Sequence, residues 1–175
     1  MNILHSSRTD RWFTPEYLIE MIKAVLGDID LDPASEELAN RAIQAKTIIT
    51  QEQDGLTTEW PVGSIFLNPP GGKLNNKSLS ALFWAKLMNH KESGKLTHAI
   101  YMGFSLEQLA ISQSYHELKM LDFPLCVPSR RIKFNNPVVA KHSPSHSNVI
   151  IYIPGTIDKT DLFLETFSTI GACKQ

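Results

Sequence analysis

The chain has little cysteine. Only Cys126 and Cys173 occur among its 175 residues, which is too few for a disulfide scaffold, and neither belongs to a Cys-x-x-Cys pair or a Cys/His zinc pattern. His142 and His146 have the spacing of a metal pair, but no acidic residue or cysteine accompanies them. We therefore expect neither a disulfide framework nor a metal site.

Long hydrophobic runs and an excess of charge are also absent. No apolar stretch approaches the length of a membrane-spanning helix, and the first six residues lack the hydrophobic core of a signal peptide. The formal net charge is −1, so a nucleic-acid partner would have to meet locally clustered cations. With 42% apolar residues, the sequence predicts one globular domain over residues 1–175, in a reducing cytoplasm.

Short apolar segments alternate with helical patterns along the chain. This alternation predicts an α/β fold with a mostly parallel sheet covered on both faces. The end of the chain predicts a C-terminal antiparallel hairpin, in which a strand within 129–136 pairs with 149–153, before a last helix at 159–170. Pro124 interrupts the strand expected at 121–127, which places that strand near a sheet edge. The other strands are expected at 29–32, 47–49, 64–67 and 98–102, and the other helices at 16–26, 36–42, 79–93 and 106–115.

The motif Asn68-Pro69-Pro70 follows the apolar strand Ile65-Phe66-Leu67. Two prolines can continue neither a sheet nor a helix, so they form a rigid corner at the end of the strand. In open α/β sheets, ligands bind beyond the carboxyl ends of the strands. Asn68 is therefore a candidate active-site residue, whereas the ordinary alternative is a proline-containing loop.

Acidic residues follow two earlier strands. Asp30 and Asp32 alternate with apolar residues ahead of a turn at Pro33, and Asp54 lies in a polar loop after the next strand. Acids at such strand ends commonly bind ribose hydroxyls or an ammonium group. The structural alternative is that Asp32 caps the next helix while Asp30 is solvated.

Basic residues gather late in an otherwise neutral chain. Arg130, Arg131 and Lys133 lie close together, and a second group of cations follows at 141–146. Such a cluster suits phosphate contacts, although a solvated charged strand is the usual explanation. Lys73 follows Gly71-Gly72 and could also reach a phosphate.

Four short motifs occur along the chain in the order Trp12-Phe13-Thr14-Pro15, Asp30-Leu31-Asp32-Pro33-Ala34, Asp54-Gly55-Leu56 and Asn68-Pro69-Pro70. Two later segments, Arg131–Phe134 and Ser147–Ile153, follow them. The four motifs in this order resemble the phage-type DNA N6-adenine methyltransferase (Dam) family, and the two later segments resemble that family's C-terminal hairpin.

The resemblance implies a Rossmann-like methyltransferase fold, S-adenosylmethionine as methyl donor, DNA as partner, and a phage or prophage protein acting in a bacterial host. It places Thr14 and Pro15 near the methionine end of the donor and includes Trp12 among the cofactor-binding residues. It also places Asp30 or Asp32, with Pro33, beside the donor, and Asp54 at the donor's adenine amine. Asn68, Pro69 and Pro70 would receive the target base.

One position departs from the pattern of many amino-methyltransferases, which carry a base-stacking aromatic residue after the two prolines. Here that position is Gly71. Candidates for a replacement stacking residue are Trp12, Phe13, Trp84 and Phe104. The alternatives are that the base is bound more weakly, or that Gly71-Gly72 leaves room for close approach of the backbone. Two other functions remain open: methylation of another planar amine, such as a protein glutamine or an RNA base, and nucleic-acid binding with little catalysis. Target specificity would lie in loops such as 71–78 and 135–147, since no separate recognition domain is visible.

Overall fold

The structure is a computed structural model that describes residues 13–134 and 146–175. Residues 1–12 and 135–145 lie outside this description. Within the described ranges, no helix has the length and apolar character needed to cross a membrane.

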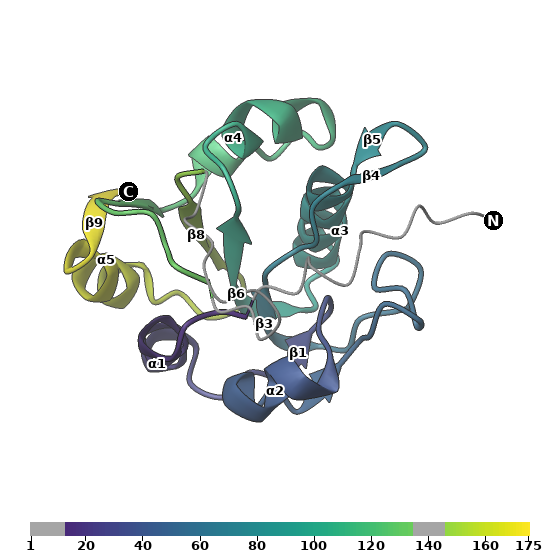
Figure 1. Ribbon diagram of the computed structural model, residues 1–175, viewed down its shortest axis with the longest axis horizontal. Coiled ribbons are helices and arrows are strands. Elements are labelled where there is room, and N and C mark those ends of the chain that lie inside the picture. The colour runs from purple at the N-terminus through teal and green to yellow at the C-terminus, as the bar shows by residue number, and fades with distance from the viewer. Residues whose placement is uncertain (1–12, 135–145) are drawn as a thin grey trace.

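A seven-stranded sheet in the order β2-β1-β3-β6-β8-β7-β9 runs through the described chain (Figure 1). Strands β2, β1, β3 and β6 are mutually parallel, whereas β8 is antiparallel to both β6 and β7, and β9 to β7. Because β6 and β7 are both antiparallel to β8, β7 runs in the same direction as β6 and the other parallel strands. The sheet strands are β1 (Leu31–Asp32), β2 (Thr47–Ile48), β3 (Gly63–Leu67), β6 (Leu96–Gly103), β7 (Leu125–Pro128), β8 (Val149–Pro154) and β9 (Gly171–Lys174).

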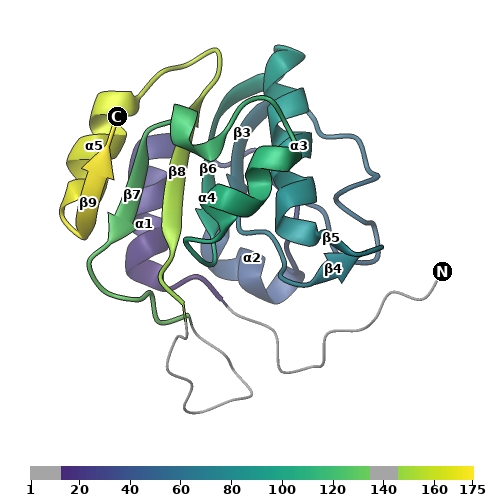
Figure 2. The same cartoon turned by 90° about the horizontal axis from the view of Figure 1, so that it is seen from above.

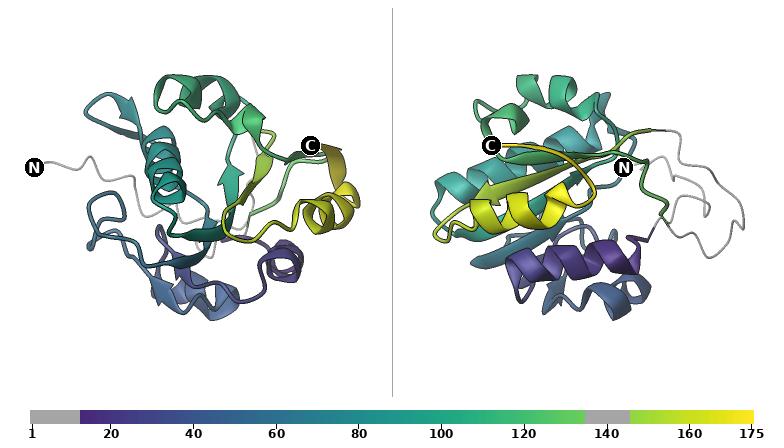
Figure 3. Two further views of the ribbon diagram at one scale, coloured as in Figure 1. Left: turned by 180° about the vertical axis from the view of Figure 1, so that it is seen from behind. Right: turned by 90° about the vertical axis from the view of Figure 1, so that its left-hand side faces the viewer.

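Helices cover both faces of the sheet. Helices α3 and α4 pack on one face, and α1, α2 and α5 pack on the other (Figures 1 and 2). Helices α1 and α5 lie beside each other (Figure 3). The helices are α1 (Glu16–Leu26), α2 (Glu37–Ile43), α3 (Leu79–Glu92), α4 (Gln108–Ile111) and α5 (Thr160–Ser168), with 3₁₀ turns η1 (Ser112–Ser114) and η2 (Met120–Asp122) and a small hairpin of β4 (Lys73–Leu74) and β5 (Lys77–Ser78).

Alternate residues of the central strands feed two separate hydrophobic cores. Leu67 and Tyr101 pack with α3, whereas Phe66 and Ile100 pack with α1 and α5. This explains why the central strands read as continuous apolar runs, since both of their faces are buried. The predicted α/β class, with parallel strands and antiparallel strands near the C-terminus, is confirmed at this level.

Local signals at the helix ends match the structure closely. Ser78 caps α3, where its Oγ accepts a hydrogen bond from the Ala81 amide at 3.4 Å. Gly27 ends α1 with φ of 73°, a conformation that glycine adopts without strain. At the start of α1, Pro15 takes the N-cap position, directly before the predicted first helical residue Glu16.

The C-terminal third differs from the prediction in two ways. Residues 129–134 form no strand, and β8 pairs with β6 and β7 instead. Pro124 precedes β7, which is the strand next to the edge, so the prediction that this strand lies near an edge is confirmed. The edge is β9, a strand that the sequence did not predict; it follows the shorter helix α5 and aligns Cys173 with Cys126 of β7.

Candidate active site

The carboxyl ends of β1, β3 and β6 lie along one edge of the sheet. Leu31 of β1 is in register with Ile65 of β3, and Leu67 of β3 is in register with Tyr101 of β6. The residues that leave these strands therefore meet at the same edge, from which the β4–β5 hairpin also projects (Figure 2). Parallel strands gather ligand-binding groups at this edge.

Asp32 is the acid at the carboxyl end of β1. Its side chain is 2% exposed, and its Oδ1 accepts a hydrogen bond from the Ala34 amide at 3.2 Å. Burial raises the pKa of Asp32 to about 7, because removal from water disfavours the charged form more than the bonds from Ala34 and Ser35 favour it. A buried carboxyl group that titrates near neutrality is typical of functional sites.

Asp30 lies at the other end of β1 and is engaged within the fold. Its carboxylate accepts hydrogen bonds from the Ser64 amide at 2.8 Å and from Lys46 Nζ at 2.9 Å. Burial acts to raise the pKa of Asp30, but the bonds from Ser64 and Lys46 outweigh it and hold the pKa below its usual value. Asp30 thus ties β1 to β3 and to the segment before β2.

Asp54 opens the loop that follows β2 and helps to shape it. The residue has φ of 58°, and its Oδ1 accepts a hydrogen bond from the Leu56 amide at 2.9 Å. Behind it, the Trp60 indole donates to the Gly55 carbonyl at 2.9 Å, and Lys86 Nζ donates to the Leu56 carbonyl at 2.8 Å. These contacts hold a loop that forms no helix or strand of its own.

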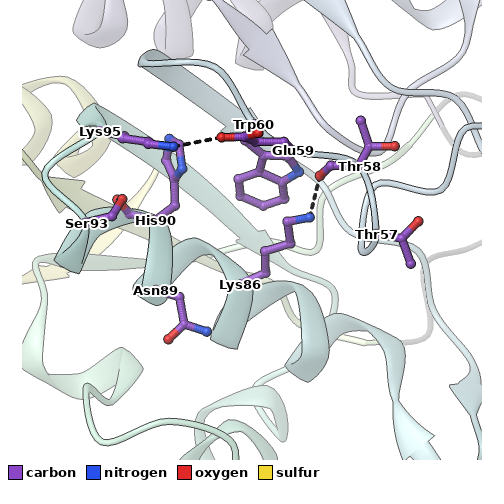
Figure 4. Close-up of a pocket in the computed structure, with 9 residues that line it drawn as sticks. All are labelled: Thr57, Thr58, Glu59, Trp60, Lys86, Asn89, His90, Ser93 and Lys95. Atoms are coloured by element: carbon purple, nitrogen blue, oxygen red, sulfur yellow. Dashed lines mark hydrogen bonds and ion pairs between the residues drawn. The ribbon is translucent and has the colours of Figure 1, made fainter.

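Trp60 and Lys86 also line a hollow of about 280 Å³, together with residues 57–59 (Figure 4). His90 meets the Trp60 ring edge to face at 5.7 Å between centroids, and burial lowers the pKa of His90. The hollow lies near the starts of β3 and β6, since Trp60 and Lys95 precede these strands. It is therefore separate from the strand ends that carry Asp32 and Asn68.

Asn68-Pro69-Pro70 leaves β3 directly after buried Leu67. Asn68 is half-buried, Pro69 is buried and Pro70 is exposed. The loop that follows is closed where the Leu79 amide donates to the Gly72 carbonyl at 3.1 Å. The segment after Gly72, which was predicted as part of a loop over 71–78, forms the β4–β5 hairpin. A rigid corner thus presents Asn68 at the sheet edge.

The remaining predicted cofactor residues lie at the start of α1. Thr14 and Pro15 are buried, and the Pro15 carbonyl accepts the first bond of the helix from the Leu18 amide at 3.0 Å. Trp12 lies outside the described residues. The structure therefore brings Pro15 to the first turn of a helix that packs on the β3–β6 half of the sheet.

The predicted DNA-contacting cations are all exposed. Lys73 lies on the β4–β5 hairpin, and Arg130, Arg131 and Lys133 follow β7. Since β7 runs in the same direction as β6, these three residues leave the sheet from the same edge as Asn68. His142 and the rest of the second basic group, apart from His146, lie outside the described residues.

The candidates for a stacking aromatic residue differ sharply in exposure. Trp84 is fully buried in the apolar core, with its ring packed edge to face on Tyr101 at 5.4 Å and on Phe123 at 5.7 Å between centroids, so this ring is already occupied within the fold. Phe104 is 37% exposed directly after β6. Phe13 is half-buried before α1. Of the described candidates, Phe104 directly follows β6, the strand that pairs with β3 ahead of Asn68.

A family model of DNA N-6-adenine-methyltransferase (Dam) matches residues 2–102. This range includes both acid-bearing turns, the Asn-Pro-Pro corner and the three parallel strands that carry them. The chain belongs to the Dam family. No curated protein matches it. Dam membership supports DNA adenine methyltransferase activity and implies DNA as substrate. The match ends within β6. Strands β7, β8 and β9 and the basic segment lie beyond the matched range, so the match does not test the resemblance of the C-terminal hairpin.

Sequence reasoning missed two residues that support the candidate site. Trp60 and Lys86 donate hydrogen bonds to carbonyl groups of the Asp54 loop, and no sequence signal indicated that a tryptophan and a helix lysine would do so. Gly55 carried a usable signal, because a glycine after an acid in a loop often marks a close backbone approach.

Proposed function

We propose that this protein transfers a methyl group from S-adenosylmethionine to the N6 amine of adenine in DNA. The observation that carries the proposal is the placement of Asp32 and Asn68 at the carboxyl ends of neighbouring parallel strands. One strand end offers a buried carboxyl group for the methyl donor, and the next offers an amide beside a rigid proline corner for the acceptor. Family membership supports the same reaction.

The residues around Asp32 fit an S-adenosylmethionine site. The donor has hydroxyl and ammonium groups that a carboxylate binds well. Asp32 accepts a hydrogen bond from the Ala34 amide, and its pKa is raised to about 7. Asp30 is already held by Ser64 and Lys46, so we assign the donor contact to Asp32, with Pro33 beside it. Thr14 and Pro15 would hold the methionine end, and Asp54 would accept from the adenine amine.

The bound donor supplies an electrophilic methyl group on a sulfonium. An adenine amine is a poor nucleophile because its lone pair is delocalised into the ring. The Asn68 amide oxygen and the Pro69 carbonyl would each accept a hydrogen bond from one N–H of the amine. These two bonds favour a tetrahedral nitrogen whose lone pair points at the methyl carbon. Because Asn68 and Pro69 accept hydrogen bonds but are not bases, the extra proton that the amine carries after methylation would leave to water. Pro70 keeps both acceptors fixed.

The target base must leave the duplex to reach Asn68, at a cost of a few kcal/mol. A stacking surface offsets part of this cost, and we assign it to Phe104 because this ring is exposed beside the end of β3. Lys73, Arg130, Arg131 and Lys133 would contact phosphates along the same edge. These contacts supply the sequence-independent part of DNA affinity.

A methyl-transfer assay on unmethylated DNA with a tritium-labelled donor tests the proposal, followed by nucleoside analysis. We expect N6-methyladenine from the wild type and a loss of at least about a hundredfold for Asn68→Ala, the scale of a lost oriented polar group. Asn89→Ala, on the exposed side of α3, is the matched control and should keep full activity. S-adenosylhomocysteine should raise the melting temperature of both variants. Label in another base, or in added protein, would contradict the proposed acceptor.

A further inference from the structure

A buried glutamine lies next to the end of β6. Gln108 is 1% exposed and begins helix α4. A Cβ built on Gly103, the last residue of β6, would lie 3.5 Å from the Gln108 Cβ. Gln108 therefore packs over the end of the strand that pairs with β3, on the side covered by α3. Phe104 lies between these two residues in the chain.

A chain of hydrogen bonds fixes which way the Gln108 amide faces. The Ser80 hydroxyl lies 2.5 Å from Gln108 Oε1 and 3.0 Å from the Ser78 hydroxyl. A 2.5 Å separation suits an O–H···O bond and is too short for N–H···O. Ser80 therefore donates its proton to the Gln108 oxygen, and Ser78 donates to Ser80. The amide oxygen faces Ser80 and the Nε2 group faces away from it.

The same chain of bonds reaches the loop after the Asn-Pro-Pro corner. Ser78 ends the β4–β5 hairpin, and its backbone amide donates to the Tyr115 hydroxyl at 3.0 Å. The next residue, Leu79, closes the loop on Gly72. Ser80 also anchors β6, because the Tyr101 hydroxyl donates to its carbonyl at 2.9 Å. Gln108 is thus held rigidly against the elements that position Asn68.

Hydrogen-bonding capacity is left over at this place. Within the described residues, the buried hydroxyls of Ser105 and Ser112 have no hydrogen-bond partner, and the one side-chain hydrogen bond of Gln108 is the bond that its Oε1 accepts from Ser80. All three belong to one short segment after β6. Buried polar groups in folded proteins are nearly always paired, so this cluster has the character of a lining that awaits a polar ligand.

We propose that Gln108 Nε2 donates a hydrogen bond to ring nitrogen N1 of the target adenine, beside the amine that Asn68 holds. This proposal rests on the proposed function and extends it to base recognition. A flipped base is read along its Watson–Crick edge, where adenine presents an amine next to an unprotonated N1. Guanine presents a carbonyl next to an N–H at the same positions. An acceptor at Asn68 with a donor at Gln108 matches adenine and opposes guanine.

The test combines a variant with a modified base. The wild type first methylates plasmid DNA, and the modified positions are mapped to define the site. Duplexes of that site then carry adenine or 1-deazaadenine, in which a C–H replaces N1. Gln108→Glu keeps the oxygen that Ser80 binds but loses the donor. Gln113→Glu, on an exposed glutamine of η1, is the matched control.

We expect the wild type and Gln113→Glu to lose roughly tenfold in kcat/KM on 1-deazaadenine, the scale of one hydrogen bond to a buried group. Gln108→Glu should lose a similar factor on adenine and show no further loss on 1-deazaadenine. Equal losses from the modified base in all three proteins would overturn the contact. If the wild type methylates no DNA, the proposed function fails. In that case the Gln108 contact is tested by measuring duplex affinity in the presence of S-adenosylhomocysteine. Equal wild-type affinity for the adenine and 1-deazaadenine duplexes would overturn the contact.

Discussion

The backbone of Gly55 is pressed against the carbonyl oxygen of Pro33. A Cβ at position 55 would lie 2.0 Å from that oxygen and 3.0 Å from the ring of Phe83. The turn that carries Asp32 and the loop that carries Asp54 therefore meet directly, with α3 behind them. Two acids that lie on separate segments of the chain are positioned as one unit.

Gly55→Ala should disturb this unit. The added methyl group meets backbone, which cannot swing aside, so we expect a loss of about 1–3 kcal/mol in the free energy of unfolding. Affinity for S-adenosylhomocysteine should fall as well, because the Pro33 turn must shift. Urea unfolding and calorimetry measure the two effects. Gly71→Ala is the matched control for stability, since nothing lies within 4 Å of its added Cβ; an equal loss in both variants would contradict the close contact.

Asp32 should make stability depend on pH. Its folded pKa is raised to about 7, so the folded state binds the proton more tightly than the unfolded state. Its contribution to stability is therefore full below about pH 4, the ordinary pKa of an aspartate, and is lost as the pH rises towards 7. We expect Asp32→Asn to gain stability relative to wild type between pH 5 and pH 8. Parallel pH profiles in the two proteins would refute the raised pKa.

Ligand affinity should follow the opposite trend. If the donor site uses the carboxylate of Asp32, binding below pH 7 must first remove a proton. The dissociation constant of S-adenosylhomocysteine should then rise by up to about tenfold per pH unit as the pH falls from 7 to 5. Titration calorimetry in buffers of different ionisation enthalpy would detect the released proton. Asp32→Asn should bind weakly and with a flatter pH profile.

Phe104 should matter for the acceptor and not for the donor. We expect Phe104→Ala to lower kcat/KM for DNA by about tenfold or more, since base–aromatic stacking contributes about 1–3 kcal/mol. Phe104→Tyr should keep most of the activity, and S-adenosylhomocysteine affinity should be unchanged in both variants. A loss confined to thermal stability would make Phe104 a packing residue. Leu106→Ala, another exposed apolar residue of the same turn, serves as the control.

Arg130 should contribute to DNA binding through charge. For each phosphate contact removed, the slope of log affinity against log salt becomes shallower by about 0.9. We expect this change for Arg130→Ala, with little effect on the affinity for S-adenosylhomocysteine. Lys174→Ala, an exposed cation on β9, should leave the slope as it is. An unaltered slope for Arg130→Ala would return the segment after β7 to a solvated surface.

Most of the parallel half of the fold was predictable from local sequence. Ser78 and Gly27 mark helix ends through their own side chain or backbone freedom, and apolar runs such as Ile65–Leu67 mark buried strands. Strand β9 was not predictable, because Gly171–Lys174 has no β-branched residue and exists as a strand only through its pairing with β7. Likewise, residues 129–134 have strand-like composition but pair with no strand in the part of the chain that the structure describes.

The site divides in the same way. The sequence could place acids and Asn68 at strand ends, because the order of elements along the chain decides this. It could not separate Asp30 from Asp32, because the separation depends on Ser64, which belongs to a different strand. Nor could it identify Gln108, since the bond to Ser80 depends on how α3 and α4 meet.

The β4–β5 hairpin joins the rest of the protein at a narrow base. The Leu79 amide and the Gly72 carbonyl close that base, and the tip, Asn75-Asn76, is exposed with positive φ at both residues. Doubling the length of such a loop costs only about 0.6 kcal/mol in closure entropy. Extra residues can thus be inserted at Asn75-Asn76 with the sheet, the acids and the proline corner left intact. The hairpin is a position where protein engineers can graft a new DNA-reading segment, and where related sequences are free to diverge in length.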